Sequence, residues 1–143
     1  MKFVLLLAIA FVLLLVVQSI YAAKANSSAV EAMEPAEAAA QVRSGEALLI
    51  DVREPAEWKG GVAAPAYLLP LSDLRGDRTK WAHVLEDAGD KPLLLYCRSG
   101  NRYGQAAAIL AEEGFQVANI GGFRDWQAAE LPTRQADEPA GNE

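Results

Sequence analysis

The chain has very few residues that could form a disulfide or a structural zinc site. Its 143 residues include a single cysteine, Cys97, and a single histidine, His83. One cysteine cannot form a disulfide within the chain, and these two residues are too few for a structural zinc site. We therefore expect no metal and no cofactor. A mechanism that needs histidine would have to use His83, which falls on the polar face of a predicted helix.

Basic residues are also scarce. The chain has 13 Lys and Arg residues against 19 Asp and Glu residues, for a net charge of −6. Nucleic-acid binding depends on clustered lysine and arginine, so we expect no nucleic-acid partner. An acidic protein that binds an anion must gather positive charge locally, and Arg98 and Arg102 lie close to Cys97 in the sequence.

A long apolar run occurs only at the N-terminus. Lys2 precedes unbroken apolar residues over 3–17, and Ala23-Lys24-Ala25 supplies a small-x-small cleavage site. This layout predicts a secretory signal peptide over residues 1–25. The alternative is an uncleaved anchor through residues 3–23, which is about the length needed to span a bilayer. We therefore expect an exported, periplasmic protein, or one anchored in the membrane and facing the periplasm or exterior.

Short apolar runs alternate with helical patterns along the rest of the chain. This alternation predicts an α/β domain with a mainly parallel sheet and right-handed crossovers. Strands are expected over residues 47–52, 93–96 and 116–120, with one or two short strands between Gly60 and Leu71, and helices over 35–44, 79–88, 102–113 and 123–129. The predicted division is a linker or short lead-in strand over 26–34, one domain over 35–133 and a polar tail over 134–143.

The strongest chemical signal is the segment Cys97-Arg98-Ser99-Gly100-Asn101-Arg102, which lies between a predicted strand and a predicted helix. Backbone N–H groups at the start of a helix favour negative charge, and therefore favour the thiolate form of a nearby cysteine. The small, turn-forming residues at 99–101 allow the backbone to curl around a bound anion. The sequence thus predicts a reactive cysteine flanked by two arginines that attract an anionic substrate.

The length of this loop separates two classes of reaction. Phosphatases with a reactive cysteine use a Cys-x5-Arg loop, which is wide enough for a phosphoryl group. Here Arg102 stands five positions after Cys97, and Tyr103 occupies the sixth position. The loop is one residue short, which argues against a cysteine phosphatase or an arsenate reductase.

Three segments together resemble the rhodanese superfamily of sulfurtransferases. They are the cysteine loop at 97–102, the segment 49–58 with its Asp51-Val52-Arg53 start, and the segment 121–126 followed by Leu131-Pro132. The resemblance implies one rhodanese-like domain with a five-stranded, mainly parallel sheet flanked by helices on both faces. Two positions depart from the family pattern: Gly61 stands where a histidine is frequent, and Tyr103 stands where a small hydroxyl residue is common.

The resemblance also implies roles for individual residues. Cys97 would be the catalytic residue. Substrate would be bound by Arg98, Ser99, Gly100, Asn101, Arg102 and Tyr103. Apart from the resemblance, Asp51 and Arg53 at the end of a predicted strand could act at the site, but we expect them in a structural role, with Arg53 paired to Glu57 and holding the loop that follows the strand.

The function implied is transfer of a sulfane sulfur from thiosulfate or a similar anion to cyanide or a thiol, through a persulfide on Cys97. The alternative is a persulfide carrier, or sulfur-relay module, that exchanges sulfur with a thiol of a protein partner. The sequence does not separate these two hypotheses, because a single domain leaves the cysteine open to either a small anion or a partner's thiol.

Overall fold

The computed structural model describes residues 11–15, 18, 31–99 and 101–140. Five strands form one parallel sheet in the order β1-β6-β5-β2-β4. Their bounds are β1 Glu31–Ala32, β2 Leu48–Asp51, β4 Tyr67–Leu68, β5 Leu93–Cys97 and β6 Val117–Gly122. A small antiparallel pair, β3 Val62–Ala63 with β7 Thr133–Arg134, lies beside the main sheet. The predicted five-stranded parallel sheet is therefore confirmed.

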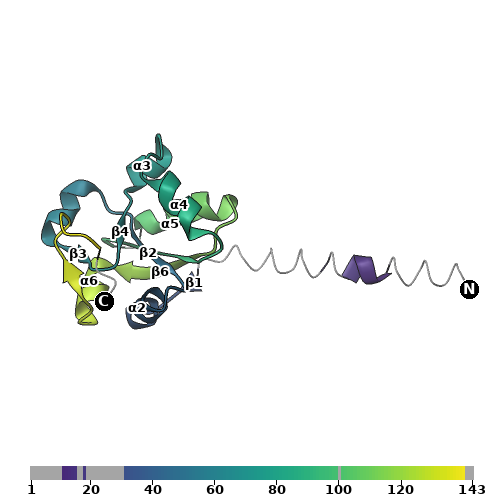
Figure 1. Ribbon diagram of the computed structural model, residues 1–143, viewed down its shortest axis with the longest axis horizontal. Helices are drawn as coiled ribbons and strands as arrows, with labels where there is room; N and C mark the ends of the chain where they lie inside the picture. The colour runs from purple at the N-terminus through teal and green to yellow at the C-terminus, as the bar shows by residue number, and fades with distance from the viewer. Residues whose placement is uncertain (1–10, 16–17, 19–30, 100, 141–143) are drawn as a thin grey trace, which may run out of the picture.

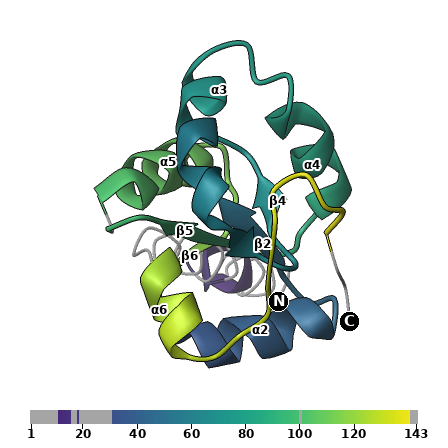
Figure 2. The ribbon, with the colours of Figure 1, turned by 90° about the vertical axis from the view of Figure 1, so that its left-hand side faces the viewer.

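Helices cover both faces of the sheet, as Figures 1 and 2 show. One face carries α3 Leu71–Arg75, α4 Trp81–Ala88 and α5 Asn101–Glu112, and the other carries α2 Pro35–Arg43 and α6 Phe123–Ala128. A short 3-10 helix, η2 Pro55–Gly60, follows β2. The sequence analysis did not predict η2 or α3, because each is too short to show a helical period.

The central strand β5 explains how the cysteine reaches its position. All five of its side chains are buried, as expected for a strand that is covered on both faces. Because side chains alternate along a strand, Leu95 and Cys97 face α5, whereas Leu94 and Tyr96 face α2 and α6. The cysteine and the tyrosine before it thus belong to two different halves of the core.

Tryptophan side chains fill the core on both faces of the sheet. Trp81 is fully buried against the α5 side, and its indole N–H donates to the Pro70 carbonyl at 3.0 Å. Trp126 is 1% exposed on the other side and donates to the Pro132 carbonyl at 2.9 Å. Each of these two rings therefore has a partner for its polar atom, whereas the indole nitrogen of Trp58, which is also buried, has none among the described residues.

Short strands lie near both ends of the domain. The short strand β1 lies inside the predicted lead-in, and Arg134, in the predicted tail, belongs to β7 and donates to the carbonyls of Ala64 and Ala66 at 2.9 Å each. The predicted cleavage site at 23–25 lies outside the described residues. Residues 11–15 are helical with exposed side chains. Within the described part of the chain, no helix is both long and apolar enough to cross a membrane.

Candidate active site

The cysteine lies at the carboxyl end of β5, just before α5 begins. Cys97 is the last residue of the strand and is fully buried, and Asn101 starts the 12-residue helix α5. The side chains of Arg98 and Ser99 are exposed. Gly100 and the side chain of Asn101 lie outside the described residues. The first turn of α5, which has no acidic residue, therefore lies only a few residues from the sulfur, so its N–H groups favour negative charge there.

The cysteine loop packs closely against strand β6 at Gly122. Cys97 pairs with Gly122 in the register of β5 and β6. A Cβ atom at Gly122 would lie 2.7 Å from the backbone carbonyl oxygen of Arg98, which is closer than van der Waals contact allows. The Gly122 N–H donates to the Asp125 carboxylate at 2.6 Å, which fixes the start of α6. Strand β6 continues through this glycine, and α6 begins at the next residue.

We expect Gly122→Ala to lower the free energy of unfolding by about 1–3 kcal/mol, because the added methyl group must displace the Arg98 backbone. Urea denaturation measures the change. The matched control is Gly104→Ala in α5, where an added Cβ meets nothing within 4 Å and should stabilise the helix by about 0.5–1 kcal/mol. Equal stability of the two variants would show that the loop does not pack against β6 as described.

A buried ion pair between Asp51 and Arg53 lies at the end of β2, next to the site. Asp51 is fully buried and Arg53 is 4% exposed, and the Arg53 guanidinium donates to both carboxylate oxygens, with its Nη2 atom 2.6 Å from Oδ2 and its Nε atom 3.0 Å from Oδ1. Burial acts to lower the pKa of Arg53, but the hydrogen bond and the charge of Asp51 outweigh it and raise that pKa. The predicted pairing of Arg53 with the Glu57 carboxylate is wrong: Arg53 contacts only the Glu57 backbone carbonyl, at 3.4 Å.

Two aromatic rings complete this support. The Arg53 guanidinium lies over the Phe123 ring at 4.4 Å and over the Tyr96 ring at 5.6 Å. The Tyr96 hydroxyl accepts a hydrogen bond from the Ala63 N–H at 3.0 Å. Burial, together with the charge of Asp51, raises the pKa of Tyr96 well above its usual value. Tyr96 is therefore neutral at physiological pH, and its ring and hydroxyl hold neighbouring segments together.

A second ion pair joins the start of α5 to η2. The Arg102 guanidinium donates to both oxygens of the Glu57 carboxylate, with Nη2 2.7 Å from Oε1. The hydrogen bond from Arg102 lowers the pKa of Glu57 to about 2, so this carboxylate is ionised at neutral pH. The Glu57 carboxylate also accepts the Glu54 N–H at 3.0 Å and thereby caps η2. The charge of Arg102, which was predicted to bind substrate, is thus compensated by Glu57.

A pocket of about 390 Å³ opens beside the cysteine loop, at the carboxyl ends of the strands. Its charged and aromatic lining residues come from the end of β2, from η2, from the cysteine loop and from α6; they include Arg53, Glu57, Arg98, Phe123 and Arg124. Arg53 and Glu57 are compensated by the two ion pairs above. Arg98 and Arg124 are exposed, and neither forms an ion pair with another described residue. The pocket therefore attracts anions.

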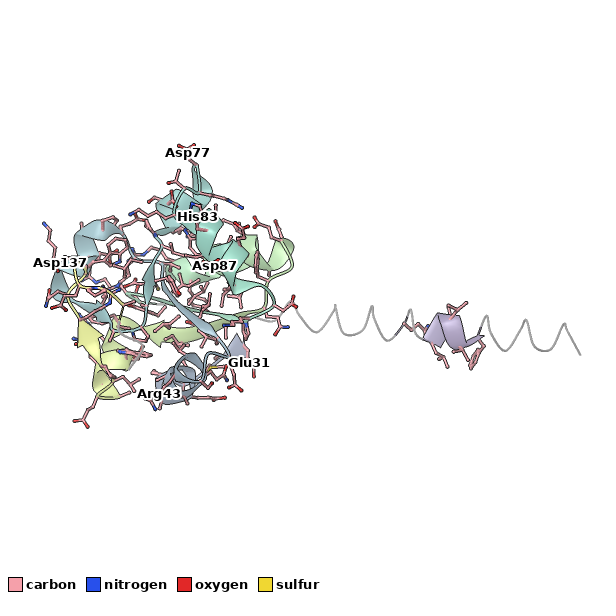
Figure 3. The ribbon with its side chains drawn as sticks, in the orientation of Figure 1. Glu31, Arg43, Asp77, His83, Asp87 and Asp137 are labelled. Carbon is pink, nitrogen blue, oxygen red and sulfur yellow. The ribbon has the colours of Figure 1, made fainter. Side chains whose placement is uncertain are left out.

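Other predicted residues lie away from this pocket lining. Tyr103 is half-buried and packs against the core cluster that contains Cys97. His83 is exposed on α4, as expected (Figure 3). Among the described residues, no group of three or more His, Cys, Asp and Glu side chains could hold a metal ion.

The sequence analysis missed the contribution of α6. Arg124 was quoted only as part of the segment 121–126, and Gln127 was not considered, yet both line the pocket. Their spacing of three residues, which puts them on the same side of a helix, was the available signal.

Comparisons with known proteins agree with this fold. The family model described as "Rhodanese-like domain" matches residues 34–129. An uncharacterized protein of Bacillus subtilis (strain 168), YqhL, is 42% identical over 82 residues, which are 56% of this chain and 60% of that protein. The chain thus spans less than two thirds of this relative.

Two further proteins are similar to the chain. An Allochromatium vinosum protein named sulfurtransferase is 36% identical over 87 residues, which are 59% of this chain and 76% of that protein. The crystal structure of a rhodanese-related protein from Thermoplasma volcanium matches with a TM-score of 0.60 and 28% identity, covering 73% of this chain and 98% of that protein.

Proposed function

Because the chain belongs to the rhodanese-like domain family, we propose that it moves a sulfane sulfur from a thiosulfate-like anion to cyanide or a thiol through a persulfide on Cys97. One observation carries the proposal. The cysteine ends a buried strand shortly before a helix, and the adjacent pocket has an arginine in the cysteine loop, Arg98, that no described carboxylate compensates. This arrangement suits a nucleophile that meets a small anion.

The first step loads sulfur onto the protein. The Cys97 thiolate attacks the outer sulfur of thiosulfate, the S–S bond of thiosulfate breaks, and sulfite leaves with the electron pair of that bond. Arg98 attracts the donor and stabilises the charge on sulfite as it leaves. Arg102, held by Glu57, orients the first turn of α5, whose N–H groups favour the negative charge of the persulfide.

The second step discharges the persulfide. Cyanide, or the thiolate of a thiol, attacks the outer sulfur and forms thiocyanate or a new persulfide. The S–S bond to Cys97 breaks and its electron pair returns to Cys97 as thiolate. No electrons are needed from outside, so the cycle proceeds without a cofactor.

We further propose that this transfer takes place outside the cytoplasm. The apolar run over residues 3–17 and the Ala23-Lys24-Ala25 site support export to the periplasm. In that compartment the protein would use small anionic donors or thiols, or a partner protein's thiol if it acts as a carrier.

Intact-mass measurement tests the proposed reaction. We expect incubation with thiosulfate to add the mass of one sulfur atom to the protein, and we expect cyanide to remove it with release of thiocyanate. If thiosulfate adds no mass but a persulfidated partner protein does, the carrier function holds instead. Turnover of a phosphate ester would contradict both, and the short loop from Cys97 to Arg102 argues against that outcome.

A further inference from the structure

One wall of the pocket is not used by the sulfur-loading step. Helix α6 contributes Phe123, Arg124 and Gln127 to the lining. Arg124 and Gln127 are three positions apart, so they lie on the same side of the helix, and both are exposed. Phe123, 8% exposed, adds an apolar surface beside them. This wall therefore offers a cation, an amide and an apolar ring next to each other.

The size of the pocket is more than a small inorganic anion requires. Its volume of about 390 Å³ lies within the range of roughly 300–1,000 Å³ that is usual for organic ligands. Arg98 belongs to the cysteine loop, whereas Arg124 belongs to α6. Two separate cations facing one pocket suit a ligand with a negative group at some distance from its reacting atom.

The charge distribution supports an anionic ligand. Arg53 is neutralised by Asp51, and Glu57 by Arg102, so neither carboxylate is available to repel an anion or to hold the two other arginines. The protein as a whole has a net charge of −6. Positive charge that is concentrated in a pocket of an acidic protein attracts anions specifically to that pocket.

We propose that Arg124, assisted by Gln127, determines the choice of acceptor by binding the carboxylate of a low-molecular-weight thiol; this inference rests on the proposed sulfur transfer. The planar guanidinium of arginine matches a carboxylate with two parallel hydrogen bonds, and the glutamine amide supplies a further donor. The carbon chain of the thiol packs against Phe123. Its thiolate attacks the outer sulfur of the Cys97 persulfide, the S–S bond breaks, and Cys97 is released as thiolate while the carboxylate is unchanged.

The test compares three short thiols that differ in charge. Protein loaded with thiosulfate and cleared of excess donor is discharged with 3-mercaptopropionate, 2-mercaptoethanol or cysteamine, and loss of the sulfur is followed by intact mass. The measured quantity is the ratio of the discharge rate with 3-mercaptopropionate to the rate with 2-mercaptoethanol. This ratio is compared between proteins, so the intrinsic reactivity of each thiol cancels.

We expect Arg124→Gln to lower this ratio about tenfold, which corresponds to the loss of one charged hydrogen-bonded contact. Arg124→Glu should lower it further and increase the discharge rate with cysteamine. The matched control is Arg43→Gln, which removes the same charge from the exposed end of α2, next to the amino ends of the strands and not among the pocket-lining residues. The control should keep the wild-type ratio.

The outcomes separate this inference from the function on which it rests. If Arg124→Gln and Arg43→Gln both load sulfur and both keep the wild-type ratio of discharge rates, Arg124 does not select the acceptor, although the transfer reaction stands. If the ratio falls equally in both variants, the effect is one of net charge and the inference is also overturned. If thiosulfate loads no sulfur onto the wild-type protein, the proposed function fails before acceptor choice is measured.

Discussion

Replacement of Cys97 by alanine is expected to abolish sulfur loading and thiocyanate formation while leaving the fold intact. The loss of transfer should be complete within detection, because the persulfide forms on the sulfur atom that this change removes; removal of a nucleophile costs on the order of 10⁴–10⁶ in rate. No other cysteine can substitute, since the chain has only one.

The structural cost of this change should be small. Cys97 is fully buried in the core cluster on the α5 side, and alanine removes a single heavy atom from it. Such a loss costs about 1 kcal/mol, which is comparable to Ile→Val in a core. Urea denaturation followed by circular dichroism measures the stability, and intact mass measures sulfur loading in the same preparation.

Cys97→Ser serves as the second variant, because it keeps the size of the side chain but removes the sulfur. It should also load no sulfur, and its buried hydroxyl should cost about 1–3 kcal/mol, somewhat more than alanine. An alanine variant that is folded and still releases thiocyanate at more than about one hundredth of the wild-type rate would contradict the role given to Cys97.

The parts of the structure that depend on local pattern could be predicted from the sequence. The apolar run before the cysteine predicted β5, and the spacing of Trp81, Val84 and Leu85 predicted α4. The position of Cys97 between strand and helix followed from these elements. A period cannot be read from five or six residues, so η2 and α3 were not predicted, whereas α6, which is equally short, was predicted from the glycines before it and the proline after it.

Contacts between distant segments were not predicted either. Glu57 and Arg102 are 45 positions apart, and no spacing rule connects them. The predicted pairing of Arg53 with the Glu57 carboxylate was wrong because it overlooked that Arg53 follows an extended strand. In an extended chain, residues two apart face the same side, and Asp51 stands two positions before Arg53. That signal was present in the sequence.

The close approach of the Arg98 carbonyl to Gly122 is another feature that the sequence alone does not predict. The pair of glycines at 121–122 indicates a turn by local rules. The structure instead requires a residue without a side chain at position 122, because the carbonyl of Arg98 lies where a Cβ would be. Only the packing of the cysteine loop on β6 reveals that requirement.

Replacement of Arg53 by methionine is expected to lower the free energy of unfolding by about 3–5 kcal/mol. Methionine fills much of the space of the arginine stem but leaves the Asp51 carboxylate, which is fully buried, without the guanidinium that compensates its charge. The variant also loses the hydrogen bond to the Gly61 carbonyl and the contact with the Phe123 ring. Urea denaturation at neutral pH measures the change.

The matched control is Arg102→Met, which removes the same group from the other ion pair of the site. The Arg102 and Glu57 side chains are 28% and 22% exposed, so water solvates the carboxylate that remains, and the cost should be only about 1 kcal/mol. A cost for Arg53→Met no larger than that of the control would show that the buried pair does not support the fold.

The double variant Asp51→Asn with Arg53→Met identifies why Arg53→Met lowers the free energy of unfolding. If most of the cost of Arg53→Met comes from the uncompensated charge of Asp51, removing that charge should recover a large part of it, and the double variant should be more stable than the sum of the two single changes predicts. Additive costs would instead assign the loss to the packing of Arg53 against Phe123 and Tyr96. In either case the lining of the pocket should change, because Arg53 and Phe123 are both part of it. Helix α6, which carries Arg124, also begins at Phe123.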